Sequence, residues 1–115
     1  MNNTEMLKKN YEFKYVFQKG KYVSGRYIEI YIKKNRTQKN LLGIAISKKI
    51  AKSVKRNRIK RLIRENYRLI ENELNLGNSM IILWKKNCPI KEATFTNINV
   101  DLKNIFQKTD IIDKQ

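Results

Sequence analysis

The stretch KSVKRNRIKRLIRENYR, residues 52–68, decides the fold, because it combines helical apolar spacing with eight Lys or Arg among its seventeen residues. Steps of roughly 100° per residue gather an arc that suits a hydrophobic core: Ile59, Leu62, Ile63, Asn66, Leu69, Ile70 and Leu74. A second row, spaced i, i+4, i+7 and i+11, faces outward: Asn57, Arg61, Arg64 and Arg68. The pattern predicts a helix from about Ser53 to Asn75 with one buried face and one basic face.

The basic face destabilises the helix when it stands alone. Arg64 has like-charged neighbours in Arg61 and Arg68, whereas opposite charges at this spacing stabilise a helix by roughly 0.2–0.5 kcal/mol per pair. Lys55 and Arg58 lie in the first turn, where the helix dipole favours acids. Phosphate oxygens match the bidentate fork of arginine and would offset the repulsion. We therefore interpret this face as a nucleic-acid-binding surface rather than an ordinary solvated one.

Asn57, inside the basic row, allows two interpretations. Asparagine is common at helix starts, so Asn57 could be a helix cap. Alternatively, its amide could hydrogen-bond phosphate, ribose or metal-bound water while the neighbouring arginines supply the charge. The sequence leaves both interpretations open.

Length and charge describe a single basic domain. A chain of 115 residues suits one domain over residues 1–115. It holds 26 Lys and Arg against 10 Asp and Glu, a formal net charge of +16. Residues 1–75 carry twenty of the bases and six of the acids. Such a field favours a polyanionic partner, either nucleic acid or an anionic membrane surface.

The residues that protein catalysis usually needs are scarce. The sequence has no histidine and one cysteine, Cys88, which excludes an intrachain disulfide, zinc sites of the usual spacing and the Ser-His-Asp and Cys-His arrangements. The N-terminus lacks the apolar core of a signal peptide, and the longest apolar run, MIILW at 80–84, is too short to span a membrane. We expect a cytoplasmic protein.

The remaining periodicity places helices and strands around the basic helix. A first helix at 10–19 opens at Asn10 and ends before Gly20. Period-two alternation from Lys21, with Gly25 near a bend, predicts a strand through Lys33. The polar run at 35–40 is typical of a hairpin connection to a strand at 41–47. Another buried strand follows at 79–86, and Ile98, Leu102, Ile105 and Phe106 are spaced for a final helix.

These elements predict an α/β (α+β) two-layer sandwich with three helices on a small, mostly antiparallel sheet. The order is helix, strands, helix, strand, helix, for which we expect α-β-β-β-α-β-α. Residues 1–7 and 109–115 are predicted to be frayed tails. We expect Tyr27 and Tyr31 to lie on the sheet face opposite the isoleucines of the same strand, half-exposed. Phe13 and Phe17 suit core packing, but aromatic rings beside arginines are also how proteins hold single-stranded nucleic acid.

The segment SKKIAKSVKRNRIKRLIREN, residues 47–66, resembles the signature of the bacterial ribonuclease P protein subunit. The matching positions are Arg56, Asn57, Arg58, Lys60, Arg61, Arg64 and Glu65. The first helix with Phe13 and Phe17, the turn at Gly20 and the order of the strands extend the resemblance over nearly the whole chain. Ala51 and Ser53 depart from the glycine and alanine of many members, which affects the start of the basic helix.

The resemblance implies that a large RNA is the catalyst and that the protein assists it in removing the 5′ leader from precursor tRNA, with Mg²⁺ bound mainly by the RNA. It implies a left-handed crossover into the basic helix, no catalytic residue in the protein and no directly bound metal, with Asn57 as the one candidate metal contact. The implied contacts to the ribonuclease P RNA are Lys48, Lys49, Arg56, Asn57, Arg58, Lys60, Arg61, Arg64 and Arg68. The implied cleft for the single-stranded precursor tRNA leader contains Phe13, Phe17 and Tyr31.

Other classes of protein share parts of this pattern. A small ribosomal or other structural RNA-binding protein would have the same charge and the same lack of catalytic residues. DNA binding fits less well, because the basic helix is also the main core helix. Membrane binding fits poorly, since the apolar face of that helix is needed for the sheet. An autonomous nuclease would need acids at metal-ligand spacing, and the sequence has no such pair.

Overall fold

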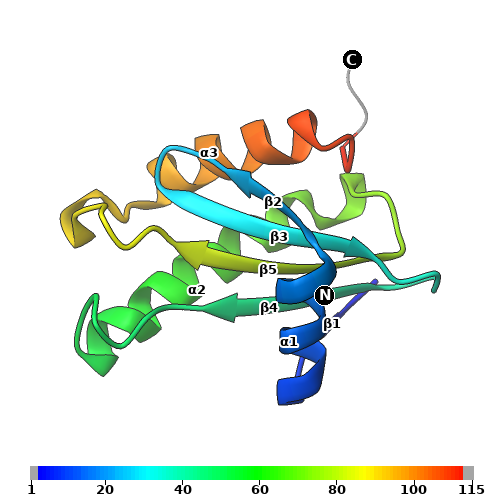
Figure 1. Ribbon diagram of the computed structural model, residues 1–115. Coiled ribbons are helices and arrows are strands. Elements are labelled where there is room, and N and C mark those ends of the chain that lie inside the picture. Colours follow the sequence, from blue (N-terminus) through cyan, green and yellow to red (C-terminus); the bar gives the residue numbers. More distant parts are fainter. Residues whose placement is uncertain (1–2, 113–115) are drawn as a thin grey trace.

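The computed structural model describes residues 3–112 and shows one mixed sheet flanked by helices (Figure 1). The strands are β1 (Thr4–Met6), β2 (Lys21–Ser24), β3 (Ile28–Lys34), β4 (Asn40–Ala45) and β5 (Asn78–Trp84). The helices are α1 (Asn10–Lys19), α2 (Ser53–Ile70) and α3 (Phe95–Lys108), with short 3₁₀ turns η1 (Glu71–Glu73) and η2 (Ile90–Glu92). The α+β class and the three predicted helices are confirmed.

The sheet has the order β1-β4-β5-β3-β2 and differs in pairing from the predicted one. Two pairings are parallel, β1 with β4 and β4 with β5, and two are antiparallel, β5 with β3 and β3 with β2. The expected hairpin through residues 35–40 is wrong, because β5 lies between β3 and β4. The reason is burial: six of the seven residues of β5 are buried, so this strand takes the centre of the sheet, which a local turn signal cannot reveal.

The crossover from β4 through α2 to β5 joins neighbouring parallel strands. In Figure 1 both strands point to the left, β5 lies above β4, and α2 passes behind the sheet. This path is left-handed, as the family resemblance implied and against the usual preference for right-handed crossovers. It places α2 and α3 on one face of the sheet and α1 on the other.

Alternating strand residues build a core on each face. The larger core joins α2 and α3 to one side of the sheet and includes Ile28, Ile30, Ile59, Ile63, Met80, Ile82, Trp84, Ile98, Leu102 and Phe106. The smaller core lies under α1 and includes Leu7, Val16 and Ile81, with Phe13, Tyr31, Leu41, Ala45 and Leu83 packed against it. Because α1 covers only part of its face, the rest of that face is available to ligands.

The buried arc of α2 is rotated relative to the predicted one. Ile59, Ile63, Asn66 and Ile70 are buried as expected. Leu69, however, is 65% exposed, and Tyr67 takes its place in the core. The Tyr67 hydroxyl hydrogen-bonds Thr4 Oγ1 at 2.7 Å, which connects α2 to β1. Because this bond holds Tyr67 against the edge strand β1, the buried face of α2 is rotated toward Tyr67. Burial also raises the pKa of the Tyr67 hydroxyl to about 12. α2 ends at Ile70, and η1 forms the last predicted turn.

Both predicted tails are largely ordered, so that prediction is wrong for residues 4–7 and 109–112. Residues 4–6 form β1, and the next residue, Leu7, is buried. At the other end, Ile111 and Ile112 are buried, and Ile112 forms an isolated bridge with Leu74. Contacts with distant parts of the chain hold both segments in place. Each segment is too short to show a periodic pattern, so its order could not be predicted from the sequence. Predicted tail residues 1–2 and 113–115 lie outside the described residues.

Asp101 on α3 ties the last helix to the turn between β2 and β3. Its carboxylate accepts backbone N–H bonds from Arg26, Tyr27 and Ile28, each at 2.8 Å. Asp101 is only 5% exposed, so these charge-assisted bonds satisfy an otherwise costly buried charge. α3 therefore fixes one end of the sheet. Over residues 3–112, the helices are too short or too polar to cross a membrane.

Candidate nucleic-acid interface

The outer face of α2 presents the predicted basic row. Lys55, Asn57, Arg58, Arg61 and Arg68 are exposed, and Lys60 and Arg64 are half-buried. Between residues 3 and 112, the one ion pair on this helix joins Arg61 Nε to Glu65 Oε1 at 3.8 Å. An exposed pair of that length contributes little to stability. The helix therefore carries a surface with a large excess of positive charge and little internal compensation.

Arg56 and Asn57 are neighbours at the start of α2 but differ in exposure. Arg56 is half-buried, and its guanidinium donates a hydrogen bond to the carbonyl of Ala51 at 2.6 Å. This bond holds the chain just before α2 and leaves less of Arg56 for a ligand. The interpretation of Asn57 as a helix cap is wrong, because α2 begins at Ser53 and Asn57 lies inside the helix. Its exposed amide is in a position to bind a ligand.

The loop between β4 and α2 extends the basic surface. Lys48 and Lys49 are exposed. The Ser47 hydroxyl accepts the Lys49 N–H at 3.2 Å, and the Ser47 carbonyl accepts the Ile50 N–H at 3.1 Å. This compact turn follows Ala45, which packs against the core under α1. The loop thus leads directly from the α1 face of the sheet to the start of the basic helix.

An aromatic cluster lies on the α1 face of the sheet. The rings of Phe17 and Tyr31 meet edge to face, with centroids 5.0 Å apart and an interplanar angle of 76°. Tyr22 adds a third ring, 5.1 Å from Tyr31. The Tyr22 hydroxyl donates to Glu29 Oε2 at 2.5 Å, and this bond raises the pKa of Tyr22. We call Phe17, Tyr22 and Tyr31 the aromatic cluster.

Sequence reasoning missed Tyr22, although a signal existed. Tyr22 pairs directly with Tyr31 across the β2–β3 register, and residues paired in this way lie on the same face of a sheet. At 48% exposure, Tyr22 is open to a ligand. Finding Tyr22 required the register of the β2–β3 pair, which sequence periodicity does not give.

Phe13 and Tyr27 are held by core packing rather than by the ring contacts of the aromatic cluster. Phe13 is half-buried and packs over Gly43, so core packing accounts for much of its surface. Tyr27 stacks on Trp84, with centroids 5.8 Å apart, and packs against the core under α2 and α3. The expectation that Tyr27 shares the face of Tyr31 is wrong, because β3 begins at Ile28 and Tyr27 precedes its alternation.

Comparison with known proteins identifies the family. The family model described as Ribonuclease P matches residues 1–110 of the chain. The chain belongs to the ribonuclease P protein family. A ribonuclease P protein component from Clostridioides difficile is 39% identical over 111 residues, covering 96% of each chain. One from Clostridium acetobutylicum is 40% identical over 108 residues, covering 92% of this chain and 89% of the relative.

Solved structures of ribonuclease P proteins have the same fold. The Staphylococcus aureus RNase P protein superposes with a TM-score of 0.82 at 30% identity, covering 94% of this chain and 97% of that one. The Thermotoga maritima RNase P protein gives a TM-score of 0.81 at 25% identity, covering 90% and 96%. Membership of the ribonuclease P protein family makes this chain a subunit of a ribonuclease that acts in tRNA processing, with RNA as its partner.

Proposed function

We propose that this protein assists the catalytic RNA of ribonuclease P in removing the 5′ leader from precursor tRNA. The observation that carries the proposal is the outward-facing row of Asn57, Arg61, Arg64 and Arg68 on α2. The loop with Lys48 and Lys49 joins this row to the side of the sheet that holds the aromatic cluster. One chain can therefore contact a folded RNA and a single strand together.

The α2 face is the proposed contact with the RNA subunit. Guanidinium groups bind phosphate oxygens in bidentate fashion and keep their charge at all accessible pH values. Lys48, Lys49, Arg58 and Lys60 add point charges around the row. Neutralising phosphates where RNA strands converge lowers their mutual repulsion, which raises the affinity for the substrate. In this role the protein positions RNA and contributes no catalytic group.

The aromatic cluster, together with Phe13, is the proposed contact with the single-stranded leader. Phe17 is 36% exposed and Tyr22 is 48% exposed, so both can receive bases. Stacking on aromatic rings is tolerant of sequence because every base has a π-face. This suits a leader whose sequence varies from one precursor tRNA to the next.

We propose that Mg²⁺ is held mainly by the RNA subunit. Among residues 3–112 there is no group of three or more His, Cys, Asp or Glu side chains that could hold a metal ion. The residues therefore do not fit a metal site built by the protein alone. Asn57 could at most offer one amide oxygen or hydrogen-bond a metal-bound water.

The test is cleavage of a precursor tRNA by a bacterial ribonuclease P RNA at low Mg²⁺ and moderate salt, without and with this protein. We expect strong stimulation that fades as the leader is shortened. Tight RNA binding without stimulation would contradict the proposal and favour a structural RNA-binding protein. Stimulation that is independent of leader length would contradict the leader contact alone.

A further inference from the structure

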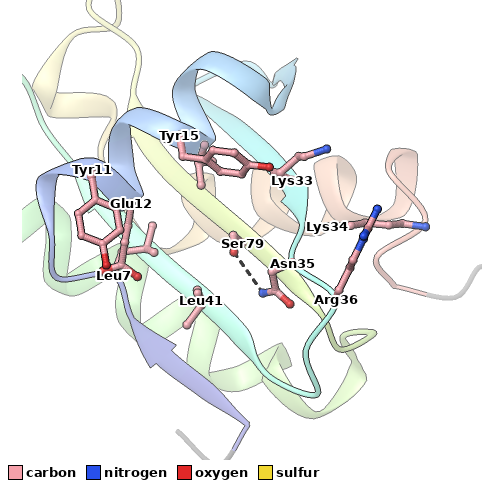
Figure 2. Close-up of a pocket in the computed structure, with 11 residues that line it drawn as sticks. Leu7, Tyr11, Glu12, Tyr15, Lys33, Lys34, Asn35, Arg36, Leu41 and Ser79 are labelled. Carbon is pink, nitrogen blue, oxygen red and sulfur yellow. Dashed lines mark hydrogen bonds between the residues drawn. The ribbon is translucent and has the colours of Figure 1, made fainter.

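A groove lies on the flank of α1 away from the aromatic cluster. It has a volume of about 640 Å³ and opens between α1 and the end of the sheet where β3 leads into β4 (Figure 2). Six of its lining side chains can meet a polar ligand: Tyr11, Glu12, Tyr15, Lys33, Lys34 and Arg36. Neither Phe17 nor Tyr31 lines it.

Helical geometry separates the groove from the aromatic cluster. Tyr11 and Tyr15 are spaced i, i+4 and share one flank of α1. Phe17, at 100° per residue, points to the opposite flank, with buried Val16 against the sheet between them. A nucleotide stacked on Phe17 therefore cannot also stack on Tyr15. The two flanks are separate surfaces of one helix.

The tyrosines of the groove are unusually exposed. Tyr11 is 67% exposed and Tyr15 is 53% exposed, so neither ring is needed to fill the core. Figure 2 shows the two rings along the same wall, with the Tyr15 hydroxyl directed toward the Lys33 side of the groove. Large rings placed in solvent at helical spacing form a stacking surface for flat groups.

Three cations form the opposite rim. Lys33 and Lys34 end β3, and Arg36 follows in the turn with a φ of 60°. Within residues 3–112, none of the three forms an ion pair. The one acid in the lining, Glu12, accepts the Lys9 backbone N–H at 3.1 Å, which places its carboxylate at the start of α1.

Hydrogen bonds fix the turn that carries these cations. The Asn35 amide donates to the carbonyl of Lys39 and to Ser79 Oγ, each at 3.1 Å. Asn35 Oδ1 accepts the Thr37 backbone N–H at 2.9 Å. The dashed line in Figure 2 marks the Asn35–Ser79 bond, which ties the turn to the central strand. The basic rim is therefore held in place before any ligand arrives.

The positive surface continues beyond the groove. A second hollow of about 310 Å³ shares Lys33 and Lys34 with the first and adds Lys19 and Lys21. Five cations thus follow one path around the ends of β2 and β3, from the groove to Thr109 and Ile111 after α3. A path of this kind matches the repeated phosphates of an extended strand better than a single anion.

We propose that this groove is a second binding site for single-stranded RNA, with bases stacked on Tyr11 and Tyr15 and phosphates held by Lys33, Lys34 and Arg36. The proposal rests on the proposed function only in taking RNA as the partner. It is independent of the aromatic cluster. The strand that fills it is either a distal part of the leader or a single-stranded segment of the RNA subunit, which present the same chemistry.

The first experiment uses the full chain and a short oligouridylate, followed by NMR of the aromatic side chains. We expect the ring signals of Tyr11 and Tyr15, assigned through Tyr11→Phe and Tyr15→Phe, to shift together with those of Phe17. Shifts confined to Phe17, Tyr22 and Tyr31 would overturn the second site and leave the proposed function intact. Shifts at Tyr11 and Tyr15 in a protein that fails to stimulate cleavage would support the site and contradict the proposed function.

The second experiment identifies the strand. A Tyr11→Ala/Tyr15→Ala variant should bind its RNA roughly tenfold to hundredfold more weakly, given typical stacking losses per base, while the corresponding double Phe variant keeps most of the affinity. Both rings are exposed, so the Ala variant should fold, as circular dichroism can verify. A loss of affinity confined to precursor tRNA with a long leader would identify the leader as the bound strand. A loss of affinity for the RNA subunit would identify that RNA. A loss for neither overturns the proposal.

Discussion

The ring of Phe13 on α1 occupies the space where a side chain at Gly43 of β4 would stand. A Cβ placed on Gly43 would lie 2.5 Å from Cε1 of Phe13 and 3.0 Å from Cδ1 of Leu7. The close approach lets α1 lie directly on the sheet. Because Phe17 and Tyr15 project from opposite flanks of the same helix, this contact sets the position of both candidate RNA surfaces.

We expect Gly43→Ala to lower the free energy of unfolding by roughly 1–3 kcal/mol, since the methyl group overpacks a filled site. Urea unfolding checks this value. A Gly43→Ala/Phe13→Leu double variant, which makes room for the methyl group, should be destabilised by less than the sum of its single changes. Full stability of Gly43→Ala would show that α1 is not fixed by this contact.

Asp101→Asn tests the link between α3 and the β2–β3 turn. An amide can keep at most one oxygen toward the three N–H donors of Arg26, Tyr27 and Ile28, and its NH₂ group faces a donor. We expect a loss of about 2–3 kcal/mol in the free energy of unfolding. Glu73→Gln removes an exposed carboxylate and serves as the control. Equal stability of the two variants would contradict the assigned role.

The raised pKa of Tyr67 predicts that the protein loses stability at alkaline pH. Burial raises its pKa from the ordinary value of 10.0 to about 12, so the folded state keeps a proton that the unfolded state releases. The resulting stability is present below pH 10.0 and is lost as the pH rises toward about 12. Tyr67→Phe should remove this dependence and the late-titrating phenol from the ultraviolet spectrum. If Tyr67→Phe instead removes a phenol that titrates near the ordinary value of 10.0, the prediction is contradicted.

The sequence predicted the local parts of this fold well. Period 3.6 located α1, α2 and α3, because each pattern depends on neighbours in the chain. Period 2 located β3 but joined it to β2 in one strand, whereas the two strands form an antiparallel pair. It failed where distant segments decide. The pairing of β1 with β4 and the insertion of β5 between β3 and β4 depend on contacts that no window of sequence contains. Tyr67 replaced Leu69 in the core because β1 supplied Thr4 as a partner.

In the candidate site, too, local features could be predicted and features that depend on distant segments could not. The outward-facing row on α2 could be predicted, since the helix wheel alone places Arg61, Arg64 and Arg68 away from the core. The groove beside Tyr11 and Tyr15 could not. It exists because α1 crosses the sheet at Gly43 and because the turn after β3 does not form a hairpin with β4.

Replacing Arg61 and Arg64 with Ala should weaken binding of the RNA subunit and flatten its dependence on salt. The logarithm of the association constant falls linearly with the logarithm of the salt concentration. Each phosphate that the variant no longer neutralises should make this slope less steep by about 0.7–0.9. A filter-binding series over several salt concentrations measures the slope. Lys103→Ala/Lys108→Ala removes the same charge from exposed positions of α3 and should leave the slope nearly unchanged. An equal effect of the two pairs would mean that net charge, and not the α2 face, determines affinity.

Phe17→Ala should weaken binding of precursor tRNA and spare mature tRNA, because the proposed function has the ring stack on the leader, which mature tRNA lacks. Removing one stacked ring costs about 1–3 kcal/mol of binding free energy. Phe17 also contacts Tyr31 at a centroid distance of 5.0 Å, so unfolding must be measured beside binding. Phe95→Ala, which removes a 41% exposed ring from α3, is the matched control. Equal losses for precursor and mature tRNA would show that Phe17 acts through packing rather than through the leader.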